Sequence, residues 1–217
     1  VVMNDGGTMV QVAVTDLAAY FDDEITAMPN LVTVGAAQQL TTLAGIPFYQ
    51  GDTGSIYTHN VSGTDSTAQY NTAYGLTALD AITSGDNNTA IGNAALGANT
   101  SGGNNTAVGY EALQSNTTAG NNTALGRGSL QNNTTGASNV AVGFEALNAN
   151  STGTRNIAIG QNAYNSSDTE NDNLAIGHDA MTTNTAGGTK NIAIGNYALD
   201  ALTSGDNNTA VGYDALT

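Results

Sequence analysis

One internal repeat determines what this chain can fold into. A pentad Asn-x-Ala-φ-Gly, in which φ is an apolar residue, occurs nine times between residues 71 and 217. Successive copies begin 17 residues apart in seven cases and 18 residues apart in one. The pentads begin at Asn71, Asn88, Asn105, Asn122, Asn139, Asn156, Asn173, Asn191 and Asn208. Self-similarity at a short fixed period is typical of a solenoid, in which each repeat forms one coil that stacks on its neighbours.

The composition of one repeat unit predicts a β-coil. Residues 89–91 (Thr-Ala-Ile) have the character of a short strand, Ala95 and Leu96 suggest a second, and residues 99–103 are rich in turn formers. The unit is too short for a pair of helices and is not a multiple of the six-residue repeat of a triangular β-helix. We therefore predict an all-β fold, a parallel β-roll solenoid of about nine 17-residue coils. Its coils would stack about 4.8 Å apart.

The repeated Asn and Gly residues are predicted to be structural. Asn side chains stacked at one position form an amide ladder, in which each amide bonds the coils above and below. Gly at the end of every pentad indicates a backbone with positive φ, or the close approach of a neighbouring chain. The residues of this predicted structural ladder are Asn88, Asn105, Asn122, Asn139, Asn156, Gly92, Gly109, Gly126, Gly143 and Gly160.

Each coil is thin. It offers about four apolar side chains, two of them Ala, which is little burial against the entropy of ordering a whole repeat. We therefore expect several chains, and specifically three, to pack around a common axis.

The repeat resembles sequences of known fibrous proteins. Residues 88–96 (Asn-Thr-Ala-Ile-Gly-Asn-Ala-Ala-Leu) and residues 105–113 resemble the head repeats of trimeric autotransporter adhesins, and are similar to repeats of phage tail fibres. The resemblance covers residues 71–217. It implies a homotrimer of left-handed parallel β-rolls that serves attachment to a surface.

The first 70 residues contain no copy of the repeat. Residues 1–12 predict two short strands joined at Asp5-Gly6-Gly7, a strong hairpin signal. Thr15 is a good N-cap for a helix that Pro29 ends. We predict a hairpin–helix attachment module over residues 1–30, an irregular connector over residues 31–70 and the β-roll over residues 71–217.

Charge and composition exclude several classes of function. The formal net charge is −15, with 18 acidic residues against three basic ones, so binding to nucleic acid is not expected. No apolar run is long enough to span a bilayer, and the absence of Cys excludes thiolate chemistry. There are two histidines, His59 and His178, and no catalytic motif accompanies them. We predict that the protein is not an enzyme.

A second pattern has a period of two coils. An aromatic, imidazole or aliphatic residue follows the pentad Gly in alternate coils, and an acidic residue follows it in four of these. This line has two interpretations. In one, each ring and carboxylate recognises sugars or divalent ions; in the other, which we prefer, the rings pack against a neighbouring chain and the acids are solvated. The line comprises Tyr110, Glu111, Phe144, Glu145, His178, Asp179, Tyr213 and Asp214.

Calcium is the only cofactor that the sequence suggests. Asp168, Glu170 and Asp172 alternate before the seventh pentad and are candidate ligands between chains. The alternative interpretation, a solvated acidic loop, is favoured.

The function we expect is a structural one. The chain would form an extracellular trimeric fibre of a phage tail or virion, joined to the particle through its N-terminal module and engaging a glycan or protein of the host surface. The alternatives are the head of a bacterial surface adhesin and a self-polymerising extracellular filament.

Overall fold

The computed structural model describes residues 67–183 and 187–217, together with five short strands that precede them. It divides into residues 1–41 and residues 42–217. In the first unit, β1 (Val2–Asp5) pairs antiparallel with β2 (Thr8–Gln11), as the Asp-Gly-Gly signal predicts. The helix expected between Thr15 and Pro29 lies outside the described residues, as does His59.

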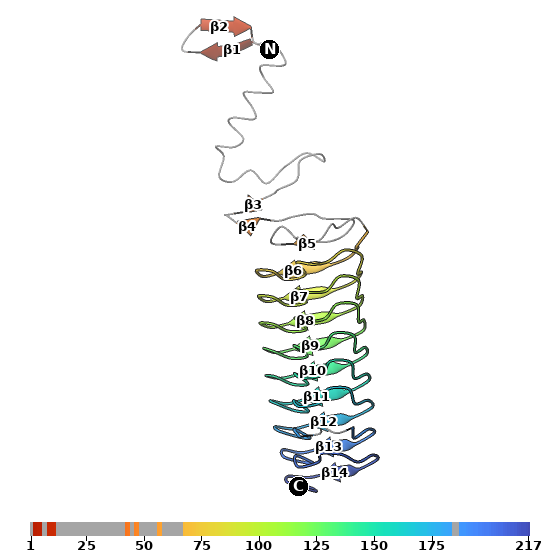
Figure 1. The fold of residues 1–217 in the computed structure, drawn as a ribbon. Helices are drawn as coiled ribbons and strands as arrows, with labels where there is room; N and C mark the ends of the chain where they lie inside the picture. The colour runs from red at the N-terminus through yellow and green to blue at the C-terminus, as the bar shows by residue number, and fades with distance from the viewer. Residues whose placement is uncertain are drawn as a thin grey trace. The chain divides into compact units, whose positions relative to one another are not determined.

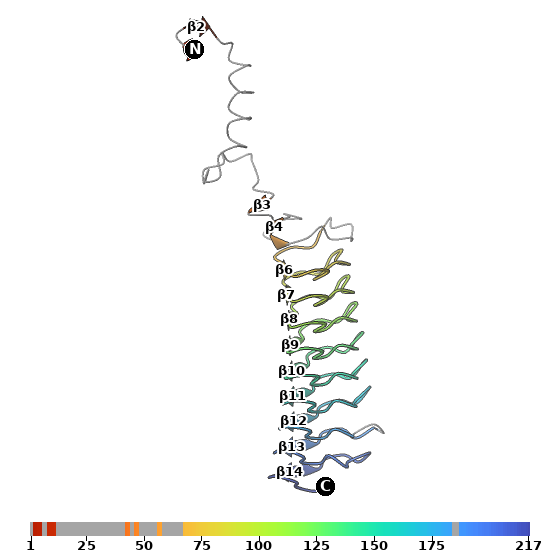
Figure 2. The same cartoon turned by 90° about the vertical axis from the view of Figure 1, so that its left-hand side faces the viewer.

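The second unit contains a parallel β-solenoid of about eight turns, so the predicted fold class is confirmed at that level. Each pentad supplies one three-residue strand, and the strands stack in chain order along one side of the solenoid (Figures 1 and 2). None of the described residues is helical. The strands are β6 (Thr72–Tyr74), β7 (Thr89–Ile91), β8 (Thr106–Val108), β9 (Thr123–Leu125), β10 (Val140–Val142), β11 (Ile157–Ile159), β12 (Leu174–Ile176), β13 (Ile192–Ile194) and β14 (Thr209–Val211).

The register follows the sequence period. Ala90 lies beside Ala73 and Ala107, and the same pairing of Ala with Ala continues to Ala210. The one 18-residue repeat does not shift this register, because Ala193 still pairs with Ala175. The additional residue is therefore accommodated outside the strands.

The connector contains more regular structure than we expected. β3 (Thr42–Leu43) pairs antiparallel with β4 (Ile46–Pro47). β5 (Ile56–Tyr57) pairs in parallel with β6 and adds a tenth strand to the sheet. Tyr57 lies opposite Ala73 and is fully buried, so a large ring occupies the register position that Ala fills in the coils.

The prediction of a second strand in each coil is wrong. Ala95 and Leu96 lie in a turn, where the Ala95 N–H donates to Gly92 O at 3.3 Å and Leu96 adopts a φ of 51°. Leu96 N–H still donates to Ala112 O in the next coil at 3.0 Å. The coils therefore remain hydrogen-bonded at this position although the backbone is not extended.

The core is a narrow column of small side chains. Ala90, Ala95 and Leu96 are fully buried, and their equivalents are buried in the other complete coils, with Ser129, Tyr164 and Met181 as substitutes. Because two of the three apolar side chains are Ala in most coils, the two walls of the coil lie close together.

The pentad Asn residues join the coils mainly through backbone groups, and the predicted amide-to-amide bond is present at the two ends of the column. There Asn88 Nδ2 donates to Asn71 Oδ1 at 3.1 Å and Asn208 Nδ2 to Asn191 Oδ1 at 3.0 Å. The Asn88 N–H donates to the Asn71 side-chain oxygen at 2.8 Å, and Asn88 Nδ2 donates to Gly102 O, within its own coil, at 2.9 Å. Each Asn thus closes its own coil and accepts a backbone N–H from the next. The pattern repeats from Asn71 to Asn191.

A continuous amide-to-amide ladder lies at another position that the sequence analysis did not identify. Asn116 Nδ2 donates to Asn99 Oδ1 at 2.9 Å, Asn133 Nδ2 to Asn116 Oδ1 at 2.9 Å, and Asn150 Nδ2 to Asn133 Oδ1 at 2.8 Å. All four side chains are fully buried.

The pentad Gly has both of the features that its repetition suggested. Gly92 has a φ of 130°, and a Cβ built on it would lie 2.4 Å from Gly109 O. The close neighbour is the next coil of the same chain, rather than another chain.

Candidate functional site

One face of the parallel sheet is apolar and exposed. In each strand from β6 to β14 the central Ala is buried, and the residues before and after it point outward. We call these outward residues the outer sheet face. The residue after Ala is apolar in all nine strands. This column comprises Tyr74, Ile91, Val108, Leu125, Val142, Ile159, Ile176, Ile194 and Val211.

The residue before Ala changes character along the rod. It is Thr in β6–β9, becomes Val140, Ile157, Leu174 and Ile192 in β10–β13, and is Thr again in β14. None of the residues of β6–β14 is charged. The outer sheet face is therefore half Thr and half apolar toward the N-terminal end, and entirely apolar over β10–β13.

This face is exposed over a considerable length. Exposed fractions are 40% at Ile91, 48% at Leu125 and, in the last strand, 66% at Val211. In β10–β13 they are 38% at Ile157, 39% at Ile159 and 36% at Ile192, and the other outward residues of these strands are half-buried. At about 4.8 Å per strand, nine strands extend about 38 Å. Parallel sheets in proteins are normally covered on both faces, and large exposed apolar patches usually mark an interaction site. The arrangement is suited to contact with another apolar surface.

The predicted ring–acid line lies beside this face, where the chain leaves each strand. The Arg127 guanidinium carbon lies 5.8 Å from the centre of the Tyr110 ring and 5.2 Å from that of Phe144. Arg127 comes from the intervening coil and thus links two rings that the sequence analysis had treated as separate sites. A hydrogen bond to the Glu111 carboxylate, and the charge of that carboxylate, raise the pKa of Tyr110.

An amide ladder connects to the same line. Gln131 Nε2 donates to Glu111 Oε2 at 2.8 Å and to Gln114 Oε1 at 3.2 Å. Asn148 Nδ2 donates to Gln131 Oε1 at 3.1 Å. Glu111 is thereby held by its own chain.

Toward the C-terminal end the line becomes an aromatic cluster. The His178 and Tyr197 rings meet edge to face with centres 5.3 Å apart, and Tyr197 and Tyr213 do so at 5.7 Å. His178 Nδ1 lies 3.2 Å from Asp179 Oδ2. Tyr197, like Arg127, belongs to an intervening coil. The two-coil period of the sequence does not predict its contacts with His178 and Tyr213, because that period includes alternate coils only.

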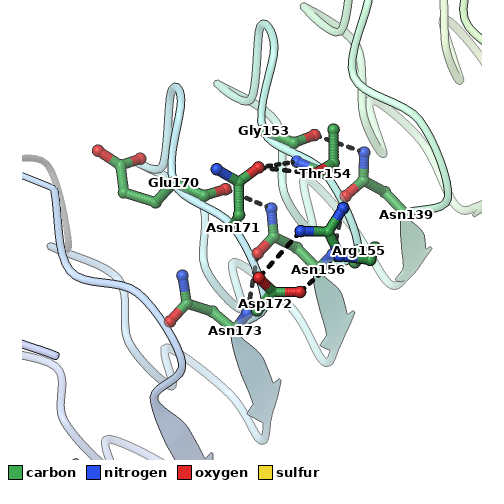
Figure 3. A network of polar contacts seen from close by, with 9 residues as sticks. All are labelled: Asn139, Gly153, Thr154, Arg155, Asn156, Glu170, Asn171, Asp172 and Asn173. Atoms are coloured by element: carbon green, nitrogen blue, oxygen red, sulfur yellow. Dashed lines mark hydrogen bonds and ion pairs between the residues drawn. The ribbon is translucent and has the colours of Figure 1, made fainter. Parts of the chain in front are cut away.

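The described part of a single chain does not bring the candidate calcium ligands to one point. Figure 3 shows the Glu170 and Asp172 side chains pointing away from each other. Glu170 is 4% exposed, and its Oε2 accepts N–H groups of Asp168 at 2.9 Å and Thr169 at 3.0 Å. Asp168 accepts the Ser151 hydroxyl. Among the described residues no group of three or more His, Cys, Asp or Glu side chains is placed to hold a metal ion.

Asp172 is engaged in an ion pair between coils. Arg155 Nε donates to Asp172 Oδ1 at 2.6 Å and its NH2 group to Oδ2 at 3.0 Å. This hydrogen bonding lowers the pKa of the Asp172 carboxyl and raises that of Arg155. Nearby, Asn171 Oδ1 accepts both the N–H and the hydroxyl of Thr154 at 2.7 Å (Figure 3). These contacts connect adjacent coils by hydrogen bonds and an ion pair.

Comparisons with family models, with curated proteins and with solved structures find no match. In the part of the chain that the structure describes, no helix has the length and apolar character needed to cross a membrane.

Proposed function

We propose that the chain is a non-enzymatic, homotrimeric attachment-fibre protein whose solenoids pack through their outer sheet faces around a common axis. The stacked coils provide a stiff rod, and threefold repetition multiplies weak contacts with a target surface. The setting we propose is an extracellular phage tail or virion fibre that engages a glycan or protein of the host.

The observation that carries this proposal is the uncovered apolar face. Nine outward apolar residues stand in one column on a parallel sheet, and the strands around them carry no charge. A solenoid with so thin a core gains burial when this face is covered. Covering it with the same face of other copies requires no further protein.

Charge favours the same face. The chain carries a formal charge of −15, so association of identical copies through most of its surface would bring acids together. The described acids, such as Asp80, Glu111 and Asp168, lie in turns outside the strands. The outer sheet face avoids that repulsion. The number of copies, and the role in attachment, come from the resemblance to trimeric head and tail-fibre repeats.

The test places charge on the proposed contact. Ile159→Asp together with Ile176→Asp adds two acids to adjacent strands of the outer sheet face. The matched control is Ser101→Asp with Thr118→Asp, two exposed turn residues of adjacent coils. Sedimentation velocity should show a trimer for the wild type and the control, and dissociation for the face variant.

If the control dissociates as readily as the face variant, or if the face variant remains trimeric, the outer sheet face is not the contact. Circular dichroism spectra of each variant test whether the coils remain folded. If the Asp variant unfolds, Ile159→Thr with Ile176→Thr tests the same two positions with neutral polar side chains in place of charged ones. Long filaments of the wild type would favour the self-polymerising alternative.

A further inference from the structure

We propose that the contact between copies is divided along the rod, with β10–β13 forming the cohesive half and β6–β9 a weaker, hydrated half. This inference rests on the proposed function, since it assigns unequal roles to two parts of the same face. The partner is a second copy of this chain.

The division follows the residue before the central Ala. In β10–β13 both outward columns are aliphatic, so the face is apolar across its width; these residues are Val140, Val142, Ile157, Ile159, Leu174, Ile176, Ile192 and Ile194. In β6–β9 one column consists of Thr72, Thr89, Thr106 and Thr123. The coils on either side of the change are otherwise alike in strand length and register.

Thr on this face limits how dry a contact can be. A hydroxyl group removed from water needs a hydrogen-bond partner, and a sheet face that meets another apolar face offers few. Water retained beside the Thr column satisfies these hydroxyls, at the expense of apolar burial. The aliphatic column of β10–β13 carries no such requirement, so close packing is favoured there.

The edge of the face gives an independent indication. Two residues before β11, β12 and β13 stand Arg155, Asp172 and Lys190, all exposed, with opposite charges alternating along the rod. The same position before β7, β8 and β9 holds Asn87, Asn104 and Asn121, which are uncharged. An apolar centre bordered by polar and charged groups is the usual anatomy of a protein interface. At this position of the edge, charge stands beside β11–β13, whereas Ser138, two residues before β10, is uncharged.

The chain offers a matched pair of residues for the test. Ile91 in β7 and Ile159 in β11 occupy the same column, directly after the buried Ala, and are 40% and 39% exposed. The residue on the other side of the Ala is Thr89 in one strand and Ile157 in the other. Ile91→Thr and Ile159→Thr are therefore the same chemical change at equal exposure in the two halves.

The measurement is the concentration at which the full-length trimer dissociates, followed by sedimentation equilibrium for each variant. We expect Ile159→Thr to raise that concentration at least roughly tenfold more than Ile91→Thr, since each loss of apolar contact is repeated in every copy. The reverse substitution, Thr106→Val, should lower it, because it extends the apolar width into the N-terminal half.

The outcomes separate this inference from the proposed function. Equal effects of Ile91→Thr and Ile159→Thr in a protein that remains trimeric would overturn the division and leave the trimer intact. A larger effect of Ile91→Thr would reverse the assignment. A wild-type protein that stays monomeric at every concentration would remove the proposed function together with this inference.

Discussion

Ser167 stands one coil beyond Asn150, at the position where four preceding coils have asparagine, and none of the described residues donates a hydrogen bond to Asn150 Oδ1. Asn150 Nδ2 is well bonded, to Asn133 Oδ1 at 2.8 Å and to Gly153 O at 3.1 Å. The buried amide ladder therefore ends at Asn150 Oδ1, a buried oxygen that accepts no hydrogen bond from the described residues.

Extending the ladder should stabilise the solenoid. Ser167→Asn supplies the missing Nδ2 donor to Asn150, and satisfying a buried carbonyl oxygen is worth about 1 kcal/mol. Where the Glu170 side chain leaves too little room, Ser167→Asn with Glu170→Gly restores the residues of the preceding coils. Thermal unfolding measures the change. Asn133→Ser, which removes a donor and an acceptor from the middle of the ladder, is the opposite control and should lower stability by about 1–3 kcal/mol.

Gly109 should not tolerate a side chain. Its φ is 142°, and a Cβ would lie 2.4 Å from Gly126 O, so Gly109→Ala must separate two coils or change the turn. We expect a loss of about 2–4 kcal/mol in the free energy of unfolding. Gly97→Ala is the control, because its Cβ would meet no atom closer than 3.3 Å. Comparable destabilisation by the two substitutions would contradict the close-approach account.

The period in the sequence was sufficient to predict the stacking. Every pentad has Ala at its third position, as at Ala90. The strands pair Ala with Ala, as a constant 17-residue step requires. The conformation of individual residues was less accessible. Leucine is common in strands, but the narrow coil turns at Leu96, whose φ is 51°. Its N–H donates to Ala112 O of the next coil, and its carbonyl oxygen accepts the Asn99 N–H of its own coil.

The candidate sites show the same contrast. Repetition of Asn88 indicated a structural role, but the choice between side-chain and backbone partners depends on the distance between coils, which a sequence does not contain. The second ladder could have been found, since Asn99, Asn116, Asn133 and Asn150 also recur at 17 residues. Its repetition is shorter than that of the pentads, because Ile82 and Ser167 replace Asn at the equivalent positions on either side.

The ring–acid line should contribute to stability. Tyr110→Ala with Phe144→Ala removes both rings that contact Arg127, each contact being worth about 0.5–1 kcal/mol at an exposed site, together with any packing against a neighbouring copy. The melting temperature should fall, and less so in an Arg127→Ala background, where the cation is already absent. Unchanged melting with loss of glycan binding would instead favour the sugar-recognition interpretation.

Acid should weaken the contacts between coils at two carboxylates. The pKa values of Asp172 and Asp206 are lowered from a usual value of 3.8, chiefly by hydrogen bonds from Arg155 and from Thr189. A carboxyl with a lowered folded-state pKa stabilises the fold above the unfolded-state pKa, and this contribution is lost as pH falls through the folded-state value. Stability should therefore decline below about pH 4.

The variant Asp172→Asn with Asp206→Asn should flatten that decline in thermal melts recorded between pH 2 and pH 6, in steps of about half a unit. Asp214→Asn, a single exposed acid near the last strand, serves as a charge-changing control and should leave the decline in place. A decline of equal steepness in the double variant would show that other carboxyls govern acid unfolding.

The mass of the native particle, measured by multi-angle light scattering with and without a chelator, tests the proposed assembly most directly. We expect three times 21.8 kDa in both conditions, because apolar faces hold the copies together. A trimer that dissociates on chelation would place a metal ion between the chains. A particle of 21.8 kDa would show that no other copy of the chain covers the outer sheet face, and would contradict the proposed trimer.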